Sequence, residues 1–179
     1  MTSDWRADVL KFWFGLEPAQ WWNGGPELDH RIKQNFLQLW REKRRLPVDA
    51  FLIDPQTAAA AVILFDQFPR NMFRGAADAY STDTLALAIA KGAVARGFDK
   101  ELTRGERSFL YMPFQHSEHL EDQDRSVLLF TALGDDHQRG YARQHRDIIE
   151  RFGRFPHRNA ILGRASRPDE IAADADEPW

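Results

Sequence analysis

The sequence predicts an all-α protein with a single domain, and three observations lead to this class. Apolar residues recur at helical spacing along most of the chain, no alternation of apolar and polar residues bounded by hairpin turns is sustained, and Pro or Gly marks the ends of the periodic segments. A chain of 179 residues, 43% of them apolar, can also bury a core without disulfides. We expect seven to eight helices in antiparallel pairs, arranged either as a bundle or as a helical-repeat array.

The N-terminal part of the chain predicts two helices from their start and stop signals. The first spans residues 3–14, with Ser3 as its N-cap and Gly15 as its stop. Residues 21–25 then form a loop. The second helix spans residues 26–47, between two prolines, and keeps its apolar residues at helical spacing.

The middle of the chain predicts three more helices. The third begins at residues 54–55, carries the run AAAAVILF and should end near Pro69, whose ring lacks an N–H and clashes with the preceding turn. The fourth spans residues 82–96. Thr103 and Glu106 have the spacing of a capping box, so they open a fifth helix.

The C-terminal part continues the helical pattern. Pro113 should kink or split the fifth helix, because proline removes a backbone hydrogen bond. Two further helices are predicted at residues 121–133 and 136–152, separated by Gly134 and ended by Gly153.

The composition excludes several classes of protein. The absence of cysteine excludes disulfides, thiolate nucleophiles and zinc-thiolate sites. The N-terminus has acidic residues where a signal peptide would be basic, and the longest apolar run, residues 58–65, is far short of the roughly 20 residues of a membrane-spanning helix. We therefore expect a cytoplasmic protein with no membrane contact. The net charge of −3 argues against a protein that holds nucleic acid mainly through its overall field.

The charge is distributed unevenly near the C-terminus. Residues 139–167 contain eight Arg and two acids, a local balance of +6 that could hold an anion. Residues 168–179 contain five acids and no Lys or Arg, so we expect an acidic tail after a helical domain of residues 1–167. The tail either folds back on the basic segment or is a solvated terminus.

A first candidate site follows the apolar run of the third helix. A carboxylate at Asp66 is costly there unless it is paired, and Arg70 follows it by four residues, the favourable spacing on a helix. The pair either pins a helix end or lets Asp66 orient Arg70, with Asn71 and Arg74, toward an anionic ligand.

A second candidate is the segment FLYMPFQHSEHLEDQD. Its apolar stripe continues at helical spacing into His116 and then to His119 or Leu120, so we expect both histidines to face inward. An inward pair is either structural or supplies a general acid or base. The spacing H-S-E-H lacks the i, i+4 histidines of zinc-protease helices, and we expect no metal site and no cofactor.

A third candidate surrounds the second Phe-Pro segment. A loop held by buried rings can aim guanidinium forks and an amide at a carboxylate or phosphate, or it can tie itself to a helix end. The residues concerned are Arg154, His157, Arg158 and Asn159. His145, on an apolar stripe, is expected to be a hydrogen-bonded core residue. Trp21 and Trp22 either plug the end of the core or line a pocket.

Four stretches of the chain resemble a bacterial family of unknown function with a tetratricopeptide-like helical fold. They are VLKFWFGLEPAQWWNGG, LFDQFPRNMFRG, ERSFLYMPFQHSEHLEDQDRSV and HRDIIERFGRFPHRNAILGRAS, and together they reach from near Val9 to about Ser166. The resemblance implies a compact array of antiparallel helix pairs. It implies no activity, cofactor or catalytic residue.

Three functions remain open at this point. The first is a binding module for a small anionic molecule or peptide, with the polar segments gathered in one pocket. The second is a small hydrolase or transferase in which His116 or His119 moves protons and Asp66 orients a partner. The third is a nucleic-acid contact through residues 139–167. The sequence does not indicate the oligomeric state.

Overall fold

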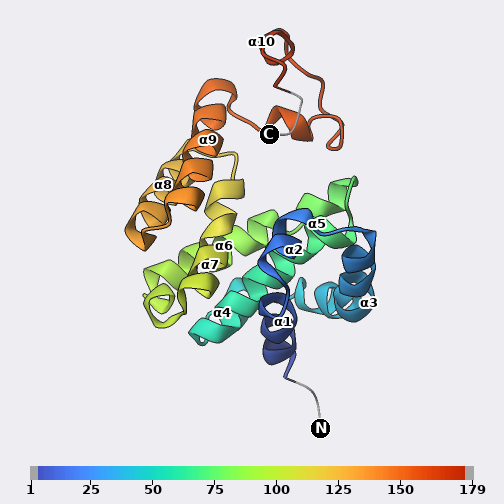
Figure 1. Ribbon diagram of the computed structural model, residues 1–179, viewed down its shortest axis with the longest axis vertical. Coiled ribbons are helices and arrows are strands. Elements are labelled where there is room, and N and C mark those ends of the chain that lie inside the picture. Colours follow the sequence, from blue (N-terminus) through green and yellow to red (C-terminus); the bar gives the residue numbers. More distant parts are fainter. Residues whose placement is uncertain (1–3, 176–179) are drawn as a thin grey trace. The chain divides into compact units, whose positions relative to one another are not determined.

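The computed structural model describes residues 4–175 and confirms the all-α class, since the described residues form helices and no strand (Figure 1). The elements, with η for 3-10 helices and for the π-helix η2, are α1 (Trp5–Phe14), α2 (Pro18–Asn23), α3 (Pro26–Lys43), η1 (Val48–Phe51), α4 (Pro55–Val62), η2 (Ile63–Gln67), α5 (Phe68–Met72), η3 (Ala77–Tyr80), α6 (Asp83–Ala95), η4 (Phe98–Glu101), α7 (Arg104–His116), α8 (Leu120–Leu133), α9 (Asp136–Phe152), η5 (Pro156–Arg158) and α10 (Pro168–Ala172). None of the described helices is long and apolar enough to cross a membrane.

Most of the predicted helix ends are confirmed, because a local residue determines them. Gly134 and Gly153 end α8 and α9 in the left-handed conformation, with φ of 70° and 71°. The Thr103 backbone N–H donates to Glu106 Oε2 at 2.9 Å, and the Glu106 N–H donates to Thr103 Oγ1 at 3.3 Å, which is the predicted capping box. Ser3 lies outside the described residues, and Asp4 is the observed N-cap of α1.

Two predictions about individual elements are wrong. Residues 21–25 do not form a loop throughout, because α2 extends to Asn23; Pro18 is in its first turn, and the Glu17 N–H donates to Gln20 Oε1 at 2.9 Å. The expected end near Pro69 is also wrong, because the chain continues through the π-helix η2 into α5. Pro113 lies inside α7 and does not split it.

The passage through Pro69 has a clear physical basis. Pro69 cannot donate to the Phe65 carbonyl four residues earlier, and η2 widens the turn so that the Phe68 N–H bonds to Ile63 O instead. Thr82 Oγ1 then donates to Phe65 O at 2.7 Å, so this buried carbonyl has a partner. Sequence periodicity could not reveal this replacement donor, because it comes from Thr82, the N-cap residue of α6.

The chain forms two compact units. Unit 1 extends to Arg74 and includes Asp78–Pro113; unit 2 consists of Gly75–Ala77 and the chain from Phe114 on. The predicted division between a domain of residues 1–167 and a tail stays a prediction, as does the tetratricopeptide-like pairing.

Unit 1 is built around α4. This helix packs against α1 and α6, and the small residues from Ala58 to Ala61 are almost completely buried, as expected for a helix that is apolar all round. The Phe68 ring lies next to the rings of Trp13 and Phe36, with centroid distances of 5.8 Å and 4.6 Å. These rings make an aromatic core.

Unit 2 is built around α8 and α9, which lie side by side (Figure 1). Phe130 of α8 and Ala142 of α9 have no exposed surface. Arg146 of α9 reaches back to Asp124 of α8 with an Nε to Oδ1 distance of 2.7 Å. The chain after Gly153 then passes through η5 to α10.

Candidate functional site

The first candidate segment lies in unit 1, and its buried acid is Asp66. This side chain has no exposed surface. Gln67 Nε2 donates to its Oδ2 at 2.7 Å, and Arg70 Nη1 lies 3.6 Å from its Oδ1. The predicted pairing with Arg70 is therefore observed, and it compensates part of the hydration that the carboxylate loses.

Arg70 has a second acidic partner that the sequence did not indicate. Its Nη1 and Nη2 donate to Asp83 Oδ1 and Oδ2 at 2.9 Å and 3.0 Å, and its Nη1 also donates to Asp66 O at 2.6 Å. Burial lowers the pKa of Arg70, but the charges of Asp66 and Asp83 outweigh burial and raise it overall. Arg70 thus directs its fork at an internal carboxylate.

Asn71 and Arg74 also meet an acid from elsewhere in unit 1. Asn71 Nδ2 donates to Asp29 Oδ1 at 2.8 Å, and Arg74 forms a bidentate pair with the same carboxylate at 2.7 Å and 2.9 Å. Burial raises the pKa of Asp29, but the hydrogen bonds from Arg74 and Asn71 outweigh it and lower the pKa. These contacts connect α3 to the end of α5. They agree with the alternative in which the segment pins a helix end.

Trp21 and Trp22 have different surroundings. Trp21 is half-buried, and its Nε1 donates to Trp13 O at 2.9 Å. Trp22 is 54% exposed and stacks on the Phe109 ring at a centroid distance of 6.1 Å. Trp21 thus closes the aromatic core, as one of the two predicted alternatives requires, and Trp22 covers it from outside.

The two histidines of the second candidate segment lie in unit 2, and they do not share a helix. α7 ends at His116, and α8 begins at Leu120. His116 is half-buried, but His119 is exposed at the N-cap of α8, so the prediction that both face inward is wrong for His119. The reason is the break between the helices, where Ser117 Oγ donates to Asp122 Oδ2 at 2.7 Å.

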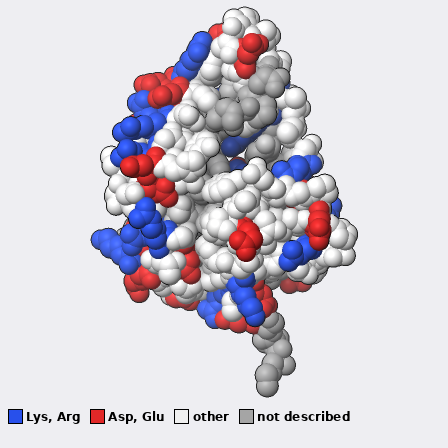
Figure 2. All heavy atoms as spheres, in the orientation of Figure 1, with Lys and Arg blue, Asp and Glu red and all other residues white. Residues whose placement is uncertain are grey.

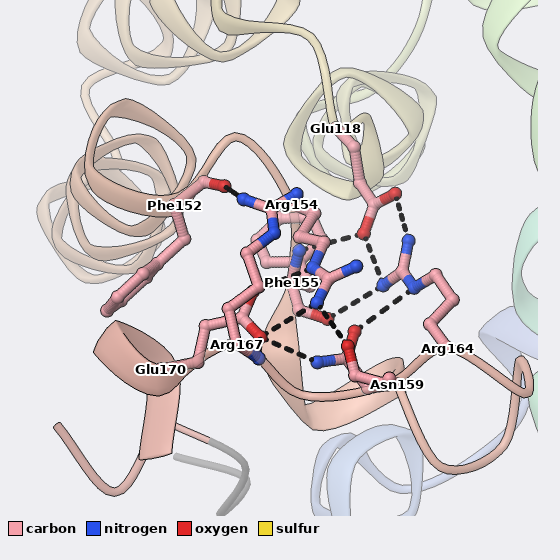
Figure 3. Close-up of polar contacts among 9 residues, drawn as sticks. Glu118, Phe152, Arg154, Phe155, Asn159, Arg164, Arg167 and Glu170 are labelled. Carbon is pink, nitrogen blue, oxygen red and sulfur yellow. Dashed lines mark hydrogen bonds and ion pairs between the residues drawn. The ribbon is translucent and has the colours of Figure 1, made fainter. Parts of the chain in front are cut away.

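Two residues of the third candidate segment bind an acid of the C-terminal tail (Figure 3). Arg154 donates to Glu170 Oε1 and Oε2 at 2.6 Å and 2.8 Å, and Asn159 Nδ2 donates to Glu170 Oε2 at 3.1 Å. Glu170 has no exposed surface, and these hydrogen bonds, Arg154's first, lower its pKa to about 2. We call Arg154, Asn159 and Glu170 the tail latch.

The tail latch decides between the two alternatives for the tail. Through Glu170 the chain folds back on the basic segment, although Asp176 and Glu177 lie outside the described residues. The Arg167 backbone N–H also donates to Glu170 Oε2 at 2.7 Å. The charge counts predicted that an acid of the tail could pair with the basic segment. They could not show which of the five acids does so.

A second network holds the loop between α9 and η5 (Figure 3). Arg164 forms a bidentate pair with Glu118 at 2.8 Å and 3.0 Å and donates to Phe155 O at 3.0 Å. The Phe155 N–H donates to Glu118 Oε1 at 2.7 Å. Burial raises the pKa of Glu118, but Arg164 and the Phe155 N–H outweigh it and lower the pKa. The sequence did not reveal this pair, whose members are 46 residues apart.

The Phe155 ring, which this network positions, is surrounded by side chains that can carry positive charge. Its centroid lies 4.5 Å from Arg158 Cζ, and 5.5 Å and 5.8 Å from the rings of His145 and His157. The ring itself has no exposed surface. We call His116, His145, His157 and Arg158 the cationic cluster, and we include His116 because its charge acts on His145.

His145 shows the electrostatic character of the cationic cluster. Burial first, and then the charges of His116, Arg158 and His157, lower its pKa to about 3, although a hydrogen bond to Tyr141 O acts in the opposite sense. Its Nδ1 lies 2.8 Å from Tyr141 O, so in the neutral ring Nδ1 is the donor and Nε2 carries the lone pair. The apolar stripe in the sequence predicts a structural His145, whereas its charged neighbours come from other segments.

The arrangement has two consequences for the sequence predictions. Among residues 4–175, no group of three or more His, Asp or Glu side chains is arranged to hold a metal ion. The segment from Asp66 to Arg74 lies in unit 1, whereas the cationic cluster and the tail latch lie in unit 2. A single pocket that unites them stays a prediction.

Fold and site together define an all-helical protein with a compact cationic cluster in its second unit. The chain belongs to a family described as bacterial protein of unknown function (DUF924), which matches residues 9–173. It is also similar to a solved structure of a protein of unknown function, ATU0120, from Agrobacterium tumefaciens. That match has 38% identity and a TM-score of 0.89, and it covers 96% of this chain and 97% of the other. No curated protein matches the chain. The predicted family membership is thus confirmed.

Proposed function

We propose that the protein is a helical binding module that captures an oxyanion, a carboxylate or a phosphate, at the cationic cluster of unit 2. One observation carries the proposal: Arg158, His145 and His157 surround the buried Phe155 ring, at 4.5 Å to 5.8 Å from its centroid. Groups that can be cations repel one another in this arrangement: after burial, which is the largest cause, the charges of His116, Arg158 and His157 lower the pKa of His145. A bound anion would relieve that repulsion.

The chemistry of the cluster suits an oxyanion. A guanidinium presents planar, paired donors to carboxylate or phosphate oxygens, and such charge-assisted hydrogen bonds are about twice as strong as neutral ones. An oxyanion would thus meet several groups of matching charge at the cluster. We also propose that the protein is cytoplasmic.

The test is a calorimetric titration with inorganic phosphate and, separately, with acetate. Arg158→Met should weaken the binding of at least one of these anions by about tenfold or more, because a hydrogen bond to a charged group contributes roughly 1.5–3 kcal/mol. The matched control is Arg151→Met. Arg151 also lies over a phenylalanine ring, 4.8 Å from the centroid of Phe152, but it is outside the cluster.

A second variant keeps the test decisive if Arg158→Met folds poorly. His157→Gln preserves a hydrogen-bond donor and removes the ability to become a cation, so it should weaken the binding of phosphate or acetate. The proposal fails if neither anion binds with saturation. It also fails if folded Arg158→Met or His157→Gln protein binds both anions as tightly as the Arg151→Met control does.

The other two functions have less support. A general base operating near neutral pH needs a pKa near that pH, and the pKa of about 3 makes His145 a weak base. His116 and His119, the predicted acid-base residues, are separated by the break between α7 and α8. Within residues 139–167, Arg139, Arg146, Arg154 and Arg164 form ion pairs with carboxylates of the chain, which leaves less charge for a nucleic-acid backbone.

A further inference from the structure

A hollow of about 380 Å³ lies in unit 1. None of its lining residues belongs to the cationic cluster. The first turn of α1, the C-terminal end of α3 and the segment around η1 surround it. Its apolar lining consists of Trp5, Leu46, Ala50, Phe51 and Ile53. Its charged residues are Asp4, Arg6 and Lys43. Its size falls in the lower part of the roughly 300–1,000 Å³ range of small-molecule sites.

The apolar lining combines a fixed base with exposed side chains. Phe51 is 1% exposed, and the Trp5 ring meets it edge-on at a centroid distance of 6.4 Å. Ile53 and Leu46 are 68% and 40% exposed beside these rings. Apolar side chains scattered singly need no explanation, but these line one hollow, and small-molecule sites are concave and mostly apolar.

The two cations at the hollow differ in how they are compensated. Arg6 forms ion pairs with Asp4 and Asp54, at 2.8 Å and 3.3 Å. Lys43 Nζ lies 5.2 Å from the Trp5 ring centroid, and no described carboxylate forms an ion pair with it. The hollow therefore combines an apolar lining with one uncompensated positive charge.

We propose that this hollow binds a monocarboxylate with an aliphatic chain, with the carboxylate at Lys43 and the chain against Trp5, Leu46 and Ile53. Charge complementarity selects the head group, because Lys43 gains the anionic partner that none of the described carboxylates provides. Burial of Ile53 and Leu46 selects the apolar body, because covering apolar surface contributes about 25 cal/mol per Å². A purely polar anion would leave this surface in water.

The experiment uses octanoate as the probe and the NMR signal of the Trp5 indole N–H, assigned by Trp5→Phe, as the local readout. Octanoate should shift this signal with saturation and a Kd on the order of millimolar, as expected for a small ligand of modest efficiency. Acetate, which has the head group without the chain, should produce no shift over the same range.

Matched variants distinguish the site from general adsorption. Lys43→Met should weaken octanoate binding by about fivefold, the upper value for an exposed ion pair. Ile53→Ser should weaken it by a similar factor through lost apolar contact. The control is Lys33→Met, because Lys33 Nζ also lies over a ring, 5.8 Å from that of Phe73, but it does not line the hollow.

Three results would overturn the proposal. They are the absence of a saturable octanoate shift at Trp5, an equal effect of Lys43→Met and Lys33→Met, and an acetate shift as large as that of octanoate. Because Lys43 and Ile53 lie in unit 1, these results are independent of phosphate or acetate binding at the cationic cluster.

Discussion

At the scale of single residues, Thr82 satisfies two buried polar groups with one hydroxyl. Its hydroxyl donates to the Phe65 carbonyl, which Pro69 cannot serve, and it accepts from Trp40 Nε1 at 3.2 Å. Thr82→Val keeps the shape and leaves both buried partners unsatisfied. We expect it to lower the free energy of unfolding by about 2 kcal/mol in urea denaturation, since each stranded group costs roughly 1–3 kcal/mol.

A matched control separates this role from the loss of any threonine hydroxyl. Thr131 Oγ1 also donates to a helical carbonyl, Val127 O, at 2.6 Å, but Thr131 is exposed. Thr131→Val should change the free energy of unfolding by no more than about 0.5 kcal/mol, because water can replace the lost partner. Equal effects of the two variants would refute the explanation of how the chain passes Pro69.

His145 supplies the second residue-scale prediction, which concerns pH. Its pKa is about 3 in the folded protein and 6.5 in the unfolded chain, so the unfolded chain binds the extra proton first as the pH falls. Stability should therefore be unaffected by this group above about pH 6.5 and decrease between pH 6.5 and 3. His145→Gln should reduce the loss of unfolding free energy between pH 7 and 5 by about 2 kcal/mol.

The titration of His145 can also be followed directly. The His145 Cε1–H signal, identified by its absence in His145→Gln, should titrate below pH 4 in NMR spectra. A midpoint near 6.5 would mean that burial and the neighbouring charges do not act on this ring as described. Added phosphate that occupies the cationic cluster should raise the midpoint, because an anion favours the charged form.

At the scale of elements, a helix end can be predicted from the sequence when the residue that determines it lies next to it in the chain. Gly134, Gly153 and the Thr103–Glu106 pair act on the helix ends next to them, so a reading of the sequence finds those ends. The helix expected to stop at Pro69 continues because Thr82, thirteen residues later, replaces the missing donor. Local rules could not include that contact, since its geometry exists only after α6 packs.

The candidate sites follow the same rule. The Asp66–Arg70 pair is local, one turn apart, and was predicted. The partners Asp83, Glu118, Arg164 and Glu170 were not, because each meets its counterpart across a loop or from another helix. His145 is a further example. Periodicity shows which face of its helix it lies on, but only the fold shows that the charges of His116, Arg158 and His157 act on it.

The tail latch gives the element-scale prediction. Glu170 is bound as a carboxylate, with a pKa lowered from 4.5 to about 2, so its contribution is complete above about pH 4.5 and lost as the pH falls toward 2. Glu170→Gln should reproduce this loss at neutral pH. In hydrogen-exchange measurements, the Arg167 amide, which donates to Glu170, should exchange at least about tenfold faster.

The control for the tail latch is the neighbouring acid Asp169. Asp169 is exposed, and its charge acts on Arg154 without a hydrogen bond. Asp169→Asn should leave the exchange of the Arg167 amide unchanged within about twofold, since exposed charges contribute little. Unchanged exchange in Glu170→Gln would show that the packing of α10, rather than its carboxylate, fixes the tail.

At the scale of the whole molecule, the fold reduces the charge asymmetry of the sequence. The balance of +6 over residues 139–167 falls to +2 when the four acids that pair with this segment from outside it are subtracted; these are Glu118, Asp124, Asp136 and Glu170. On the face drawn in Figure 2, basic and acidic side chains are interspersed. A basic count in a sequence is therefore a poor measure of the field that a partner meets.

This charge balance predicts weak binding to nucleic acid. In fluorescence anisotropy at 50 mM salt, a labelled 20-bp DNA duplex should bind with a Kd weaker than about 100 µM, outside the usual range of non-specific DNA-binding proteins. The variant Asp124→Asn/Asp136→Asn removes one exposed carboxylate partner from Arg146 and one from Arg139, although Arg146 keeps its pair with Glu150. It should bind more tightly than the parent, and its affinity should fall as the salt concentration rises, because phosphate contacts release counterions. Parent protein that binds below about 10 µM with a steep salt dependence would contradict the internal neutralisation and favour the nucleic-acid alternative.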